Sequence, residues 1–402
     1  MRFFPTQLAL ILAPALAGAC MGTQGGGRGD DTTTQDTTPC ATVQEMDGDI
    51  VIRNDSQVVP AYNGCYDLMG TLRVQGPVTS LAGLGRIQSV TDLEILGTQL
   101  GAIDTPDPIT IYDGGLDLEE NPALSDLSNL QFDNLSHVTI TNNDGLLDLG
   151  DIDLSLDKVY GDTGDAGERD GSVTISNNAN LTSIKLTRLK EIDGAITIDS
   201  NPKLTLVDFS GLTQFGTSVA LPLPWSEDIT ITNNPKLTTI KGFSQLTGLP
   251  GALVIDNNAT LASVAGFDAV TTINGNLELK DDPLLADFMT SGMLGLVGKS
   301  VTIDNTGFVT ITAFSTELDV IPLNLAITNN TKLTGVGRLA HLRDAGNGYL
   351  RNGSINQALT ITGNSELPYC AAREVQKCTT ILGSVSISSN RENSGNCTSW
   401  CQ

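Results

Sequence analysis

The segment Asp228–Ile240, with the sequence DITITNNPKLTTI, contains the pattern that decides the fold. Two Ile residues flank Thr230, so their side chains share one face of a strand while the Thr lies on the other. Asn234 comes three residues after Ile231, and Leu237 comes six residues after it. This unit of strand, polar turn residue and Leu recurs along the chain, which is typical of repeat architectures.

The repeat is defined by aligning the second apolar residue of each strand. Neighbouring positions are 21 to 26 residues apart, except for three intervals of 33 to 35 residues. A period in the low twenties predicts an all-β solenoid of about fourteen coils, each burying its apolar face against its neighbours. The aligned residues are Ile52, Val74, Ile95, Leu118, Ile140, Ile175, Ile198, Ile231, Ile255, Leu279, Ile303, Ile327, Ile361 and Ile387.

Two further positions of the repeat are expected to shape the coil. The polar residue at the third position should adopt a left-handed or turn conformation, bond turn backbone and stack into a ladder. Its members are Asn121, Asn143, Asn178, Asn201, Asn234, Asn258, Asp282, Thr306, Asn330, Asn364 and Asn390. The apolar residue at the sixth position should fill the core at the second side of the coil. These residues are Leu124, Leu146, Leu181, Leu204, Leu237, Leu261, Leu285, Val309, Leu333 and Leu367.

The units Gly171–Asn178 (GSVTISNN) and Gly194–Pro202 (GAITIDSNP), with the matching units up to Asn390, resemble the receptor L-domain family. That family is a leucine-rich-repeat-like right-handed β-helix, known from the insulin and EGF receptor ectodomains. Related arrays occur in fungal cell-wall proteins and secreted bacterial lipoproteins. The resemblance covers about Cys40 to Cys401 and implies a right-handed solenoid. It implies no specific ligand, because no ligand-binding residues of the family map onto this chain.

The composition excludes some partners. The 402 residues are 40% apolar and only 4% aromatic, which predicts an aliphatic core. Forty-six acidic residues against 22 basic ones give a net charge of −24. Such a surface repels nucleic-acid backbones and anionic lipid headgroups. We therefore expect no nucleic-acid partner, and membrane contact only through an anchor.

The N-terminus predicts export. Arg2 precedes the apolar stretch Leu8–Leu16, and Ala-Gly-Ala at positions 17–19 precedes Cys20. Ala-x-Ala suits ordinary signal peptidase, whereas Leu-Ala-Gly-Ala-Cys resembles a bacterial lipobox in which Cys20 is lipidated. We favour the lipobox because it leaves an even number of cysteines and because residues 21–39 are polar and flexible, as a tether would be.

The predicted organisation has three parts: a signal peptide (1–19), a disordered tether (20–39) and a solenoid (40–401). No other apolar run is long enough to span a membrane. The chain is expected to cross the inner membrane and to be lipid-anchored in the cell envelope, at the outer membrane or the cell surface.

The six remaining cysteines predict three disulfides at the ends of the solenoid. Cys40 and Cys65 bracket the first coil and should pair in an N-terminal cap (40–65). Residues 367–378 (LPYCAAREVQKC) predict a short helix in a C-terminal cap (367–401), which holds Cys370, Cys378, Cys397 and Cys401. The resemblance implies that Cys370 pairs with Cys397 and Cys378 with Cys401. A metal site of four thiolates is the alternative, although its spacing matches no usual zinc module.

The three long intervals hold insertions, at about 147–170, 208–227 and 334–356. They should emerge from one edge of the solenoid, where insertions often build a binding face.

Each insertion holds candidate residues with two interpretations. A solvated acidic loop is favoured over a Ca²⁺ site for Asp162, Asp165, Glu168 and Asp170. Packing against the next coil is favoured over a ligand platform for Trp225. Neutralisation of nearby carboxylates is favoured over contact with an anionic glycan for Arg338, His341, Arg343, Tyr349 and Arg351.

The catalytic signal is weak. The chain has two histidines, His137 and His341, and no recognisable catalytic motif. His137 is expected to open a strand and to be structural. The outward strand positions are mostly hydroxyls, with Glu278 and Lys280 as the only close charge pair. We therefore expect a binding or adhesion scaffold that is not an enzyme, with an unidentified protein or glycan ligand and no cofactor. The alternatives are a structural cell-envelope protein and, with less support, a β-helix polysaccharide-active enzyme.

Overall fold

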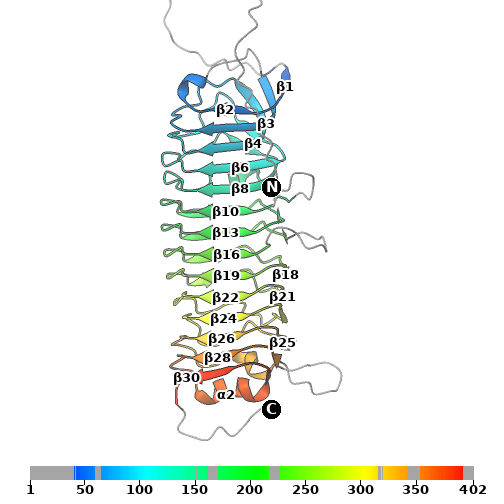
Figure 1. The fold of residues 1–402 in the computed structure, drawn as a ribbon, viewed down its shortest axis with the longest axis vertical. Helices are drawn as coiled ribbons and strands as arrows, with labels where there is room; N and C mark the ends of the chain where they lie inside the picture. Colours follow the sequence, from blue (N-terminus) through cyan, green and yellow to red (C-terminus); the bar gives the residue numbers. More distant parts are fainter. Residues whose placement is uncertain are drawn as a thin grey trace, which may run out of the picture. The chain divides into compact units, whose positions relative to one another are not determined.

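Parallel strands stack along one face of the molecule, one strand from each coil (Figure 1). The computed structural model describes residues 40, 42–58, 65–150, 152–161, 171–216, 227–315, 318, 320–342 and 354–392. Residues 40–402 form one unit, a β-solenoid of about 13 turns with 6% helix. The predicted all-β solenoid is confirmed. Fourteen parallel strands, one for each predicted coil, are present among the described residues.

We call this stack the long sheet. All the aligned residues pair with one another in a continuous parallel register, as the period predicts; Ile231, for example, pairs with Ile198 on one side and Ile255 on the other. The strands are β2 (Ile50–Ile52), β3 (Cys65–Gln75), β4 (Arg86–Leu96), β6 (Gly114–Glu119), β8 (Asn134–Thr141), β10 (Val173–Ser176), β13 (Ile196–Asp199), β16 (Ile229–Thr232), β19 (Leu253–Asp256), β22 (Leu277–Lys280), β24 (Val301–Asp304), β26 (Leu325–Thr328), β28 (Leu359–Thr362) and β30 (Val385–Ser388). β1 (Val43–Asp47) pairs with the first half of β3.

The coil has two further sides. The second side carries β11 (Ser183–Lys185), β14 (Leu206–Asp208), β17 (Thr239–Lys241) and β20 (Ser263–Val264). The third side carries β5 (Ile109–Ile111), β7 (Leu130–Phe132), β9 (Lys158–Val159), β12 (Glu191–Ile192), β15 (Gln214–Phe215), β18 (Gly248–Leu249), β21 (Thr272–Ile273), β23 (Leu296–Val297), β25 (Val320–Ile321), β27 (Ser354–Ile355) and β29 (Thr380–Ile381). Each side buries apolar residues, as Ile231, Ile240 and Leu249 do in one coil.

The predicted bounds of the insertions were too wide, because the third side was not recognised. Ile152, Val159, Phe209, Phe215 and Leu339 all lie inside the predicted insertions, yet they are buried in the core. They belong to ordinary coils, and the first interval also contains the short helix α1 (Ile152–Ser155). β9 and β15 both pair with β12, so the segments that follow them start from the same corner of the solenoid.

The polar ladder forms as predicted, but the left-handed residue is the one before it. Asn234 is fully buried, and its Nδ2 donates to the carbonyls of Thr232 (2.7 Å) and Ile198 (3.1 Å). Its Oδ1 accepts the backbone N–H of Asn201 at 3.0 Å. The positive φ of 57° belongs to Asn233, which tolerates it because a short polar side chain does. In each such Asn-Asn pair, the first residue therefore adopts the left-handed backbone conformation and the second forms the buried ladder.

One predicted core residue is exposed. Val309 is 52% exposed, and Phe308 fills the core position beside it with 3% exposure. The next coil shows why: Thr334 N–H donates to the carbonyl of Val309 at 2.8 Å, so Phe308 stands level with Leu333. This coil has one residue fewer between the ladder and the core residue than the coil that follows.

Both ends of the solenoid carry disulfides. Cys40 and Cys65 are bonded, as predicted. Helix α2 (Tyr369–Cys378) confirms the predicted short helix, and both Cys370 and Cys378 are disulfide-bonded, which removes the four-thiolate metal site. Eight residues of helix rise about 12 Å, too far for these two to bond each other. Their predicted partners, Cys397 and Cys401, lie outside the described residues, so the connectivity remains a prediction.

Two short 3₁₀ helices complete the fold, η1 (Asp55–Gln57) and η2 (Gly337–His341). Among the described residues, no helix has the length and apolar character needed to cross a bilayer.

Candidate ligand-binding face

The outward face of the long sheet presents two rows of half-buried side chains, one on each side of the aligned residue. We call them the outer rows, and in β16 they hold Thr230 and Thr232. From β8 to β28 the first row is Thr139, Thr174, Thr197, Thr230, Val254, Glu278, Thr302, Ala326 and Thr360. The second row is Thr141, Ser176, Asp199, Thr232, Asp256, Lys280, Asp304, Thr328 and Thr362. The predicted hydroxyl face is therefore present over these coils.

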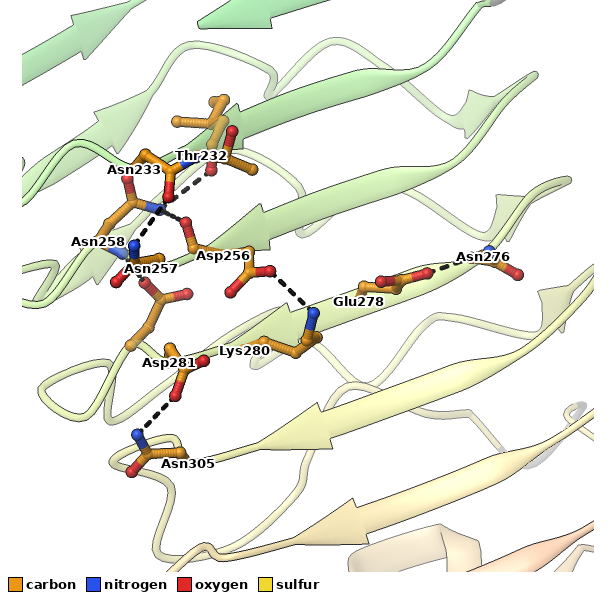
Figure 2. Close-up of polar contacts among 12 residues, drawn as sticks. Thr232, Asn233, Asp256, Asn257, Asn258, Asn276, Glu278, Lys280, Asp281 and Asn305 are labelled. Atoms are coloured by element: carbon orange, nitrogen blue, oxygen red, sulfur yellow. Dashed lines mark hydrogen bonds and ion pairs between the residues drawn. The ribbon is translucent and has the colours of Figure 1, made fainter. Parts of the chain in front are cut away.

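Three charged residues interrupt the hydroxyls on β19 and β22, namely Asp256, Glu278 and Lys280. Together with Asn276, which precedes β22, we call them the Lys280 cluster. Figure 2 shows Lys280 reaching back to Asp256, with Nζ 2.8 Å from Oδ2. Glu278 turns the other way and accepts from Asn276 Nδ2 at 3.1 Å. The predicted pairing of Glu278 with Lys280 is therefore wrong. Residues two apart on one strand are about 7 Å apart, whereas residues on adjacent strands are about 4.8 Å apart.

Hydrogen bonds hold Lys280 and Asp199 of this face in their ordinary ionisation states. The bond from Lys280 to Asp256 raises the pKa of the lysine above its usual value. Burial alone would raise the pKa of Asp199, but hydrogen bonds from Thr232 and Asn233 outweigh burial and lower it. Neither pKa moves toward neutrality, where acid–base catalysis works best.

A second charged group, which the sequence analysis missed, lies on the earlier strands of the same face. Arg73 of β3 forms an ion pair with Glu94 of β4, with Nη2 2.7 Å from Oε1. The neighbouring strand adds Asp117, which contacts His137 Nε2 at 3.2 Å. Burial raises the pKa of Glu119, and the nearby carboxylates of Asp117, Glu120 and Glu94 raise it further. The repeat could have found these residues, because Arg73, Glu94 and Asp117 each precede an aligned position.

His137 lies within β8 and does not open it. Its imidazole lies against Gly115, where a Cβ atom would sit 2.0 Å from Cε1. Its two ring nitrogens contact Asp117 Oδ2 and Ser136 Oγ, each at 3.2 Å. This resembles a nucleophile–histidine–acid set, but Ser136 is only 1% exposed and cannot reach a substrate. The arrangement fits a structural role for His137.

Most of the other predicted contact residues lie outside the described residues: Asp162, Asp165, Glu168, Asp170, Trp225, Arg343, Tyr349, Arg351 and Cys20. The backbones of Arg338 and His341 form part of η2, and their side chains are not described. Within the described ranges, no group of three or more His, Cys, Asp or Glu side chains could hold a metal ion. The weak Ca²⁺ candidate therefore remains an untested prediction.

A groove of about 590 Å³ opens beyond the end of the second-side sheet. Ser291, Thr310, Thr312 and Ser315 supply its hydroxyls, and the ring of Phe314 at its wall is only 2% exposed. A buried ring offers no surface for stacking a ligand, and the lining contains no charged residue. The groove is therefore large enough to hold a ligand, but its lining offers no exposed aromatic ring or charged group to bind one.

Comparison of the chain with protein-family models, with curated proteins and with solved structures gave no match. The resemblance to receptor L-domains therefore stays a prediction. Function has to be argued from the surface itself.

Proposed function

We propose that this protein is an extracytoplasmic binding scaffold, tethered to a membrane through Cys20, and that the outer rows of the long sheet contact its ligand. The observation that carries the proposal is the register of the rows. One hydroxyl, carboxylate or amine follows another from coil to coil along most of the sheet, at steps of about 4.8 Å. A rigid polar surface of this kind suits an extended ligand that makes many equivalent hydrogen bonds.

The outer rows favour a glycan or protein ligand without a strong negative charge. The net charge of −24 disfavours polyanions. The hydroxyls can both donate and accept hydrogen bonds, which complements sugar hydroxyls or an exposed peptide backbone. Lys280, paired with Asp256, is the one cation in the outer rows from β8 to β28 and would provide a point of registration for the ligand.

A polysaccharide-active enzyme is the second candidate, because the Lys280 cluster places carboxylates and a lysine on one sheet face. The binding role is favoured over catalysis. A lysine that removes a proton must be neutral, and the raised pKa of Lys280 keeps it protonated. The carboxylate of Glu278 already accepts a hydrogen bond from Asn276.

The binding role can be tested with the purified protein on glycan arrays and on arrays of cell-surface proteins. We expect at least one ligand, with at least tenfold weaker binding by Lys280→Met. The matched control is Lys332→Met, which removes an exposed lysine from a corner of the solenoid. Equal binding by both variants would contradict the proposal that the outer rows form the contact surface. Depolymerisation of a bound polysaccharide would favour the enzyme.

The membrane anchor can be tested by growth with radiolabelled palmitate. We expect label in the wild-type protein and none in Cys20→Ala. Label that persists in the variant would contradict the anchor without bearing on the binding face.

A further inference from the structure

The buried ladder changes character at Asp282, which is fully buried in a position held by Asn in most coils. Its Oδ1 accepts the backbone N–H of Asn258 at 2.8 Å, as an Asn oxygen would. In the preceding coil, Asn258 Nδ2 donates to the carbonyls of Ile231 (3.0 Å) and Asp256 (3.2 Å). By the same repeat geometry, Asp282 Oδ2 faces the carbonyls of Ile255 and Lys280. Oδ2 has no hydrogen-bond partner.

The next member of the ladder does not continue the chain of hydrogen bonds from Asp282. Thr306 donates both its N–H (2.9 Å) and its hydroxyl (2.7 Å) to Asn330 Oδ1. Thr98 begins the ladder in the same way, by donating to Asn121 Oδ1. Within the described residues no hydrogen bond joins Asp282 to Thr306, so the ladder consists of two runs that meet between β22 and β24. We call this meeting point the junction.

Three other irregularities coincide with the junction. The second-side sheet ends one coil earlier, at β20. The shift that exposes Val309 and buries Phe308 occurs one coil later. A small void of about 10 Å³ lies among Leu279, Ile303, Phe308 and their neighbours, barely enough for one water. The side-chain ladder, the second-side sheet and the core register therefore all change within one coil of the junction.

The charge state of Asp282 decides whether its carboxyl fits the junction. A protonated carboxyl has an O–H that can donate to either facing carbonyl, whereas a carboxylate would present an acceptor to two acceptors in a dry interior. Burial raises the pKa of Asp282 to about 7, even though the N–H of Asn258 stabilises the charged form.

The charged neighbours of Asp282 do not offset this cost. Asp256 at the end of β19 and Asp281 in the same turn both favour the protonated form. The ammonium of Lys280 is bonded to Asp256, and Asp304 at the end of β24 accepts from Thr328 and Asn329.

We propose that Asp282, the last member of the first run, forms a proton-controlled joint on the β19 side of the junction. With a proton on Oδ2, Asp282 donates to the carbonyl of Ile255 or Lys280 and closes the corner that joins its turn to β19 and β22. Without the proton, the corner opens more readily and loosens the turn that carries Lys280 and Asp281. The inference rests on the ladder alone and does not depend on the proposed binding role.

The experiment compares the wild type with Asp282→Asn and with the matched control Asp281→Asn. Both variants remove one carboxylate by an isosteric change, but Asp281 is exposed and has a positive φ that Asn also tolerates. Hydrogen exchange of peptides covering residues 253–262 and 277–290 is measured between pH 4.5 and 8.5 on the purified chain. Exchange times are corrected for the intrinsic pH dependence of amide exchange.

In the wild type we expect protection of these peptides to fall by about tenfold per pH unit up to pH 7 and then to level off, because only the open form ionises below that pH. Asp281→Asn should follow the wild type, and Asp282→Asn should be nearly independent of pH. A pH-independent wild type would overturn the proposal, and so would an Asp282→Asn variant that still follows the wild-type curve. Selective ¹³C labelling of aspartate gives a second readout, since the carboxyl signal lost in Asp282→Asn should titrate near pH 7.

Discussion

Replacing Asn234 with Ala tests whether the ladder holds adjacent coils together. The side chain is fully buried, and its loss leaves the N–H of Asn201 without an acceptor. The carbonyls of Ile198 and Thr232 each lose one donor. An orphaned buried N–H costs about 1–3 kcal/mol, and each lost carbonyl bond about 1 kcal/mol. Asn234→Ala should therefore destabilise the solenoid by about 3–5 kcal/mol.

The matched control is Asn233→Ala, the same substitution one residue earlier. Asn233 is exposed, so its replacement should cost about 1–2 kcal/mol for the left-handed backbone and two surface hydrogen bonds. Urea unfolding gives the two free energies, and hydrogen exchange of the Asn201 amide reports the local loss. Long repeat arrays can unfold in steps. If the urea transition is not two-state, the hydrogen exchange of the Asn201 amide is used to compare the two variants. A difference of less than about 1 kcal/mol between the variants would show that the ladder is not a main source of cohesion.

Three further predictions test other parts of the fold. Phe308→Ala should cost about 3–5 kcal/mol in urea unfolding, and Val309→Thr less than about 0.5 kcal/mol; the reverse order would contradict the shifted register. Cys40→Ser with Cys65→Ser should cost about 3 kcal/mol, because the bond closes a loop between residues 25 apart; unchanged unfolding in reducing and oxidising buffer would contradict this. Glu119→Gln should raise the urea midpoint at pH 7 and leave it unchanged at pH 3.5, because a raised folded-state pKa makes the wild type lose stability as pH rises through it; an equal effect at both pH values would exclude ionisation as the cause.

The positions of the long-sheet strands were predictable because their signal is local. An alternating strand such as Ile229–Thr232 fixes its own inward and outward residues, and a constant interval to the next strand fixes the register. The third side was missed because its strands are two or three residues long, too short for alternation to show. Buried residues between strands were missed as well: Phe243, between β17 and β18, packs between Phe209 (5.6 Å between ring centres) and Phe267 (4.5 Å).

The candidate site was less predictable because its contacts join different coils. The outward positions of Asp256, Glu278 and Lys280 follow from alternation along each strand. The choice of Asp256 as the partner of Lys280 depends on the spacing between strands and on the direction each side chain takes. The outward positions of Arg73 and Glu94 could have been predicted without this spacing. Each residue directly precedes an aligned position of the repeat, so alternation places its side chain on the outward face of the long sheet.

In the ladder, residues that look equivalent when the repeats are aligned can make different hydrogen bonds. Asp282 and Thr306 both occupy the polar position and look like interchangeable variants of Asn. The ladder has a direction, however: each Asn donates to the next coil and accepts from the previous one. The side chain of an ionised Asp can only accept, so Asp282 lacks the onward amide donor that Asn234 supplies to Asn258, while the Thr306 hydroxyl donates onward and begins a new run. The order Asp then Thr therefore coincides with the break in the ladder. Proton uptake by Asp282 restores a donor toward the carbonyls of Ile255 and Lys280, on the earlier side of that break.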